Sequence, residues 1–206
     1  MIIYTIGHST RSLDELVALL RAHGVTQLAD VRTVPKSRRH PHFSREALSA
    51  SLPAAGIAYR HAADLGGLRK PRADSRNTGW RHPSFRGYAD YMETDVFERG
   101  LDELIEWAEQ AALPPSRLSR FGESRRSSSE SPASGGGKAC ATSGATAVMC
   151  AEAVWWQCHR QLIADALVAR GIEVRHIMSA TAAPPHTLTQ FSRVNADLRV
   201  TYPGLI

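Results

Sequence analysis

The first 34 residues alternate between strand and helix patterns, and this alternation constrains the fold more than any other feature. Residues 2–6 form a short β-branched and aromatic run, which is typical of a buried strand. Ser12 and Glu15 have the spacing of a helical capping box, an apolar stripe follows at helical spacing, and Gly24 ends it. Residues 25–34 predict a second strand. A strand, a helix and a strand in this length predict parallel strands with a right-handed crossover.

The same alternation continues to the end of the chain. We predict further strands at residues 57–60, 145–150 and 173–177, and helices at 44–55, 83–110 (with a break near Thr94) and 158–170. The sequence therefore predicts one α/β domain over residues 1–206, with a mainly parallel sheet flanked by helices in a Rossmann-like three-layer arrangement.

One segment does not fit this pattern. Residues 113–144 contain nine serines, five glycines and three prolines, with few large apolar side chains. Such a composition buries too little surface to offset chain entropy, so we expect a disordered low-complexity insertion in the domain.

Composition narrows the class of protein. The chain is 43% hydrophobic and 22% charged, and no apolar run approaches the roughly 18 residues of a membrane span. Three cysteines, at 140, 150 and 158, are too few for a disulfide scaffold. With no export signal at the N-terminus, we expect a cytoplasmic protein with free thiols and no membrane partner.

Charge is unevenly distributed along the chain. Residues 32–45 hold five basic side chains and no acid, and residues 69–86 hold six against one acid. Residues 93–109 compensate with seven acids and one arginine. The basic segments are either solvated loops or part of an anion site, and the sequence leaves both interpretations open.

Polar side chains or glycines stand at or after the ends of four of the predicted strands. In chain order they are His8 and Ser9, then Asp30, Arg32 and Lys36, then Gly66 and Gly67, and finally Glu152, Cys158, His159 and Arg160. Because parallel strands end at the same edge of a sheet, and open α/β folds bind ligands there, we expect these residues to form one site.

Cys158 is the candidate nucleophile of this site. It stands at the start of a predicted helix beside His159 and Arg160, and both the helix terminus and these neighbours favour a thiolate. The alternative is a packed thiol beside two tryptophans. We interpret Cys150, at the end of its strand, as a structural thiol.

The other roles follow from side-chain chemistry. Glu152 is a candidate general acid or base, or else an ion-pair partner of a nearby arginine, and His8 is a candidate polar donor or base. Asp30 and Arg32 are two residues apart on their strand and therefore lie on the same face. One can then orient the other, and the guanidinium can bind an anion. The remaining substrate-binding candidates are Ser9, Lys36, Gly66, Gly67, His159 and Arg160.

Two other chemistries fit the spacing poorly. Cysteine phosphatase and sulfurtransferase loops place an arginine six residues after the cysteine, but Trp156 occupies that position after Cys150. Metal-ligand residue types are present, but Cys150 and Cys158 are eight residues apart and no tightly paired spacing exists. We therefore predict no metal and no cofactor.

The segments that follow the strands also carry a family resemblance. They resemble the domain-of-unknown-function family 488 in Tyr4-Thr5-Ile6-Gly7-His8-Ser9, Asp30-Val31-Arg32, Leu65-Gly66-Gly67 and Cys150-Ala151-Glu152 with Cys158-His159-Arg160. The resemblance covers nearly all of the chain outside residues 113–144, where the family has a short turn. It implies an α/β fold and a common site. The family carries no established reaction, although some members are labelled as related to DNA repair.

Two functions of different classes remain. The first is a hydrolase or transferase that acts on an anionic, phosphate-bearing substrate, either a nucleotide or a nucleic acid. The alternative is a non-catalytic nucleic-acid-binding or DNA-repair-associated module, in which basic side chains contact phosphates and Phe43, Trp80, Phe85 and Tyr88 stack on bases. Residues 69–80, with glycines before and within, also have the composition of a mobile flap over the sheet edge. The sequence does not indicate an oligomeric state.

Overall fold

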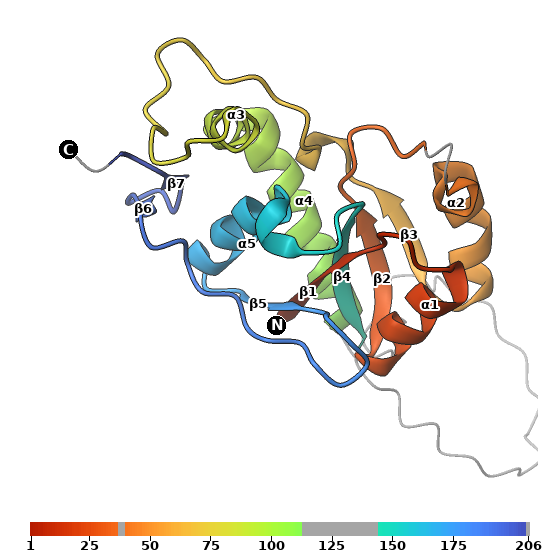
Figure 1. The fold of residues 1–206 in the computed structure, drawn as a ribbon. Coiled ribbons are helices and arrows are strands. Elements are labelled where there is room, and N and C mark those ends of the chain that lie inside the picture. Colours follow the sequence, from red (N-terminus) through yellow and green to blue (C-terminus); the bar gives the residue numbers. More distant parts are fainter. Residues whose placement is uncertain (37–39, 113–143, 205–206) are drawn as a thin grey trace, which may run out of the picture.

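A five-stranded parallel sheet forms the centre of the molecule (Figure 1). The computed structural model describes residues 1–36, 40–112 and 144–204. The strands lie in the order β3-β2-β4-β1-β5. They are β1 (Ile2–Gly7), β2 (Val25–Asp30), β3 (Ala58–His61), β4 (Ala145–Cys150) and β5 (Glu173–His176). Every pairing within this sheet is parallel, as the strand–helix alternation predicts.

Helices cover both faces of the sheet, and this confirms the three-layer prediction (Figure 1). The α-helices are α1 (Leu13–Ala22), α2 (Arg45–Ala54), α3 (Pro83–Met92), α4 (Asp95–Ala112) and α5 (Arg160–Ala169). One buried cluster joins Leu16 of α1 and Leu48 of α2 to the sheet. A second cluster joins α3, α4 and α5 to the opposite face through side chains such as Tyr88, Leu101 and Leu162. No helix in the described ranges is long and apolar enough to cross a membrane.

Local sequence signals set the helix ends. The Ser12 backbone N–H donates to Glu15 Oε2 at 2.6 Å, and the Glu15 N–H donates to Ser12 Oγ at 3.2 Å, so the predicted capping box begins α1. Gly24, at φ +66°, follows the helix in a left-handed conformation that favours glycine. The break expected near Thr94 is also present, between α3 and α4.

Two parts of the structure differ from expectation. The second strand was expected to reach residue 34 but ends at Asp30, because the Arg32 N–H donates to Asp30 Oδ1 at 3.1 Å and the chain turns there. The chain after β5 contains a small antiparallel hairpin of β6 (Arg193–Val194) and β7 (Val200–Thr201), which the sequence did not predict. Strands of two residues are too short to show a periodic pattern.

Short 3-10 helices connect the elements near the sheet edge, and those in the described ranges are η1 (Pro41–Phe43), η2 (Ala63–Leu65) and η4 (Trp155–Gln157). They follow β2, β3 and β4 respectively in the chain. The loops that carry them therefore begin at the carboxyl ends of three neighbouring strands.

Asp165 of α5 holds the C-terminal segment against the core. This fully buried carboxylate accepts hydrogen bonds from His186 Nε2 at 3.0 Å, the Thr189 N–H at 2.8 Å and the Tyr202 hydroxyl at 2.8 Å. His186 Nδ1 lies 3.0 Å from His176 Nε2, so the network continues into β5. The segment after β5 is thus fixed by buried polar contacts as well as by apolar packing.

The predicted insertion at 113–144 lies outside the described residues except for Gly144. The Gly144 N–H donates to the Ala111 carbonyl at 2.9 Å, so the two flanks of the segment meet. We predict that a short Gly-Ser linker in place of residues 114–143 changes Tm by less than about 2 °C, since closing a shorter loop is entropically easier. Differential scanning calorimetry checks this, and a non-cooperative melt of the shortened protein would contradict it.

Candidate active site

A pocket of about 390 Å³ opens at the carboxyl ends of β2 and β4. The loops after β2, β3 and β4 and the start of α3 supply its walls. Its polar lining includes Arg32, Thr33, His82, Ser84, Glu152, Gln157, Cys158 and His159, and its apolar lining includes Val34, Leu68 and Phe85. A volume in this range, with mixed lining and a few convergent polar groups, is typical of a site for a small molecule.

The structure brings part of the predicted site together in this pocket. Five predicted residues line it: Arg32, Gly67, Glu152, Cys158 and His159. Three more contact those residues from behind: Asp30 and His8 contact Arg32, and Arg160 contacts Cys158. Ser9, Lys36 and Gly66 are not among the lining residues, and the Lys36 side chain is exposed.

Two sulfurs and one imidazole nitrogen meet at the pocket wall. His159 Nδ1 lies 3.5 Å from Cys158 Sγ and 4.0 Å from Cys150 Sγ. The other ring nitrogen, Nε2, donates to the Val31 carbonyl at 3.1 Å. That hydrogen bond fixes the ring with Nδ1 directed at the sulfurs. We call Cys150, Cys158 and His159 the thiol cluster.

Arg160 supplies the positive charge of this region. Its side chain is buried, with Nε donating to Cys158 Sγ at 3.5 Å and Nη2 donating to the Glu152 backbone carbonyl at 2.5 Å. Within the described part of the chain, no carboxylate forms an ion pair with it. A buried guanidinium needs an anionic partner, and the Cys158 sulfur is the group placed to provide it. Glu152 itself is an exposed residue of the pocket lining, and only its backbone carbonyl contacts Arg160.

The surroundings of the two sulfurs shift their pKa values in opposite directions. A hydrogen bond from the Cys150 thiol, followed by contacts with His159 and Arg160, lowers the pKa of Cys158 well below its ordinary value, although burial opposes the shift. The same hydrogen bond, together with burial, raises the pKa of Cys150. Both shifts lead to the same assignment, so Cys158 is the sulfur of the pair that ionises more readily.

Asp30, Arg32 and His8 form a buried network beside the thiol cluster. Arg32 Nε and Nη2 donate to the two Asp30 oxygens at 2.8 and 2.5 Å, and Tyr59 donates to Asp30 Oδ2 at 2.8 Å. Arg32 Nη2 also donates to the Phe43 carbonyl at 2.8 Å. The guanidinium that was predicted to bind an anion is therefore largely committed to partners within the protein.

His8 is neutral in this network. Its Nδ1 donates to the Ser9 carbonyl at 3.0 Å, and its Nε2 lies 3.2 Å from Arg32 Nη1 and accepts from it. Burial, together with the charge of Arg32, lowers the pKa of His8 to about 4. Both ring nitrogens are thus occupied, and the imidazole supports the position of Arg32.

Two glycines permit the close approaches that build the site. A Cβ on Gly67 would lie 2.4 Å from His159 Nδ1, and a Cβ on Gly7 would lie 1.8 Å from the Glu152 carbonyl oxygen. Neither position has room for a side chain. The glycines of the strand-end segments are therefore needed to bring the loops after β1 and β3 against the loop after β4.

Sequence analysis missed three contributors to the site. Cys150 was expected to be structural, but its sulfur belongs to the thiol cluster. His82 and Ser84, at the start of α3, also line the pocket. Pro83 marks a helix start in the sequence, but only the tertiary structure brings that start against the loop after β4.

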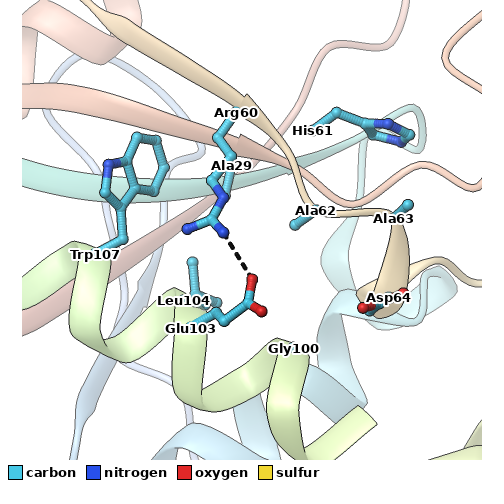
Figure 2. Close-up of a pocket in the computed structure, with 10 residues that line it drawn as sticks. All are labelled: Ala29, Arg60, His61, Ala62, Ala63, Asp64, Gly100, Glu103, Leu104 and Trp107. Carbon is cyan, nitrogen blue, oxygen red and sulfur yellow. Dashed lines mark hydrogen bonds and ion pairs between the residues drawn. The ribbon is translucent and has the colours of Figure 1, made fainter. Parts of the chain in front are cut away.

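A smaller hollow of about 160 Å³ lies between β3, η2 and α4 (Figure 2). Arg60 and Glu103 form an ion pair of 2.7 Å across it, and about half of each side chain is exposed. The hollow contains no cysteine and none of the predicted site residues. We therefore take the pocket with the thiol cluster as the candidate site.

The fold and this pocket define an α/β protein with a pair of cysteines at the carboxyl edge of a parallel sheet. The family model described as Domain of unknown function DUF488 matches residues 12–113 and 122–167. The chain belongs to this family, as its strand-end segments indicate. No curated protein and no solved structure gave a significant match.

Proposed function

We propose that the protein is an enzyme of the hydrolase or transferase class, acting on a small phosphate-bearing molecule in the pocket. Cys158 is the nucleophile, and Glu152 is the general acid and base. Cys150, His159 and Arg160 are positioning residues that favour the thiolate form of this sulfur. The proposal places the reaction in a reducing compartment, because it requires a free thiol.

One observation carries the proposal: the buried Arg160 donates to the Cys158 sulfur and has no carboxylate ion-pair partner within the described residues, and that sulfur lines the pocket. A buried packing thiol needs neither a guanidinium nor an open cavity. An activated nucleophile needs both, since the cation stabilises the thiolate and the cavity admits the substrate.

The reaction that fits these groups proceeds in two steps. Cys158 Sγ attacks phosphorus and forms an S–P bond, while the P–O bond to the leaving group breaks and Glu152 protonates the departing oxygen. Water or an acceptor hydroxyl then attacks phosphorus and gives its proton to Glu152. The phosphoryl group departs with that oxygen, and the thiolate is restored.

The surroundings of the pocket support an anionic substrate. The pocket lies between the two basic segments of the sequence, with Arg32 and Thr33 from the first and His82 and Ser84 from the second. The Arg32 guanidinium is paired with Asp30, so we assign most of the direct substrate contacts to His82, Ser84 and backbone N–H groups.

Mass mapping of alkylated protein tests the state of Cys158 without knowledge of the substrate. Under reducing conditions and with a chelator present, we predict that iodoacetamide modifies Cys158 at pH 7 at least about tenfold faster than an ordinary thiol of pKa near 8.5. Cys150 reacts far more slowly. The variant Arg160→Gln slows modification of Cys158, whereas Arg60→Gln, a matched change at the smaller hollow, does not. Equal reactivity of both cysteines would contradict the assignment.

Phosphate release from a panel of nucleotides and sugar phosphates tests the reaction. We expect Cys158→Ala and Glu152→Gln each to lower the rate by about 100-fold or more, the usual range for a nucleophile or a general acid. Cys140→Ser and Glu103→Gln are the matched controls and should retain the rate. Full activity in Cys158→Ala would refute the role of the thiol.

The non-catalytic nucleic-acid module has less support. Of the four aromatic residues proposed to stack on bases, Phe43 and Tyr88 are fully buried, and Trp80 stacks on Phe85 at 4.8 Å between ring centroids. These rings are engaged within the protein. Tight oligonucleotide binding with a steep salt dependence, in the absence of turnover, would favour the module instead.

A further inference from the structure

We propose that Cys150, Cys158 and His159 form a binding site for one divalent metal ion of the zinc class, with an open coordination position facing the pocket. The inference rests on the proposed function only in locating the reaction centre at this pocket. It assigns to Cys150 a second role besides its hydrogen bond to Cys158, that of a metal ligand.

The spacing of the three ligand atoms matches a tetrahedral ion. Zinc bonds of about 2.3 Å to sulfur and 2.0–2.1 Å to nitrogen separate a sulfur from a nitrogen by about 3.5 Å and two sulfurs by about 3.8 Å. His159 Nδ1 is 3.5 Å from Cys158 Sγ and 4.0 Å from Cys150 Sγ, and all three atoms lie within 4.8 Å of one another. A small adjustment of Cys150 completes the geometry.

The imidazole is oriented as a metal ligand requires. His159 Nε2 donates to the Val31 carbonyl and keeps its proton there, so Nδ1, which is the ring nitrogen beside the sulfurs, is the one that offers its lone pair to an ion. Metal-ligating histidines almost always make such a hydrogen bond with the other ring nitrogen. Gly67 packs against the same ring, where a Cβ would lie 2.4 Å from Nδ1.

The fourth position is open to the pocket. Cys150, Cys158 and His159 all line it, so an ion among them faces the cavity of about 390 Å³. Three protein ligands with one open position define a catalytic rather than a structural zinc site. Water or an anionic substrate oxygen fits that position.

Charge also favours a divalent ion. Cys158 is the thiolate partner of Arg160, and binding of the ion displaces the proton of the Cys150 thiol to solvent. Two thiolates then neutralise the ion, and Arg160 keeps its N–H···S contact with Cys158. Thiolate and imidazole ligands select zinc-class ions over magnesium or calcium.

Metal binding and nucleophilic attack by Cys158 are alternative states of one site. A coordinated sulfur is no longer a free nucleophile, so the ion protects Cys158 from alkylation. The metal-free protein is the form that carries out the thiol reaction under "Proposed function". Metal occupancy therefore regulates that reaction.

Cobalt titration of the metal-free, reduced full chain, carrying Cys140→Ser, tests the site. We expect a thiolate-to-cobalt charge-transfer band that saturates at one ion per chain and is displaced by one equivalent of zinc. Zinc should also slow alkylation of Cys150 and Cys158 by at least about tenfold. Absence of the band, or alkylation that zinc does not slow, would overturn the proposal.

Ligand variants identify the residues. Cys150→Ala and His159→Ala should each weaken zinc binding by at least about 100-fold, more than the loss of an outer contact. His82→Asn, which changes a histidine that lines the same pocket outside the cluster, should leave the affinity within about threefold. Thermal melts confirm that each variant folds. If one ligand variant does not fold, the zinc affinity of the other variant and the stoichiometry of cobalt binding test the proposal.

The two proposals fail separately in these measurements. Stoichiometric metal binding without any phosphate release supports the metal site and counts against the thiol enzyme. Phosphate release that depends on Cys158, in a protein that binds no cobalt, supports the enzyme and overturns the metal site.

Discussion

Replacing Asp30 by asparagine is expected to destabilise the folded protein by about 3–5 kcal/mol, the usual effect of removing one partner of a buried ion pair. Asp30 is fully buried, and its two oxygens accept three hydrogen bonds from Arg32 and one from Tyr59. Asparagine keeps the shape but leaves the Arg32 guanidinium buried without its counter-charge. Urea unfolding followed by circular dichroism measures the change.

The double variant Asp30→Asn/Arg32→Met is the matched control. It removes both charges and keeps an unbranched side chain at Arg32, so it should recover much of the loss that either single variant suffers. If the changes in unfolding free energy of the two single variants and the double variant are strongly non-additive, the ion pair is the source of the lost stability. A loss below about 1 kcal/mol in Asp30→Asn would show that the pair is not buried in solution.

Acidification is expected to destabilise the protein well above the pH at which most carboxylates titrate. His176 is buried at the end of β5, between the sheet and the C-terminal segment. Burial, together with the charges of His186 and Arg160, lowers its pKa to about 3. Its Nδ1 lies 2.7 Å from Thr5 Oγ1, its Nε2 lies 3.0 Å from His186 Nδ1, and Trp155 stacks on the ring at 4.0 Å. Asp165 completes the network on the far side of His186.

The direction follows from proton linkage. In the unfolded chain His176 titrates near 6.5, so between that pH and about 3 the unfolded state binds the proton more tightly. The contribution of His176 to the free energy of unfolding is therefore fully present above pH 6.5 and is lost progressively as the pH falls below that value. The slope is about 1.4 kcal/mol per pH unit from this histidine once the pH is well below 6.5.

Unfolding free energies measured from pH 7.5 to 4.5 test this expectation. The variant His176→Gln should be less stable at pH 7.5 but should show a flatter pH dependence, because the linked proton is gone. His23→Gln, which changes a histidine at the end of α1, should keep the wild-type slope. An unchanged slope in His176→Gln would exclude this residue as the source.

Much of the fold could be predicted because local physics determines it. The capping box at Ser12 and the strand–helix alternation are short-range signals, and parallel strands with helical crossovers leave few arrangements other than a layered α/β fold. The end of β2 was missed because a contact between Asp30 and Arg32, rather than β-propensity, ends that strand. The β6–β7 hairpin was missed because strands of two residues leave no pattern in the sequence.

For the site, the sequence determined which residue types stand at the strand ends, because a parallel sheet brings all its carboxyl ends to one edge. Only the tertiary structure decided their partners. It turned Arg32 inward to Asp30 and placed Arg160 on Cys158 rather than on the Glu152 carboxylate. It also brought Cys150, eight residues from Cys158, against the same imidazole. Side-chain partnership depends on loop paths and burial across the fold, and neither is encoded in the spacing of residues along one segment.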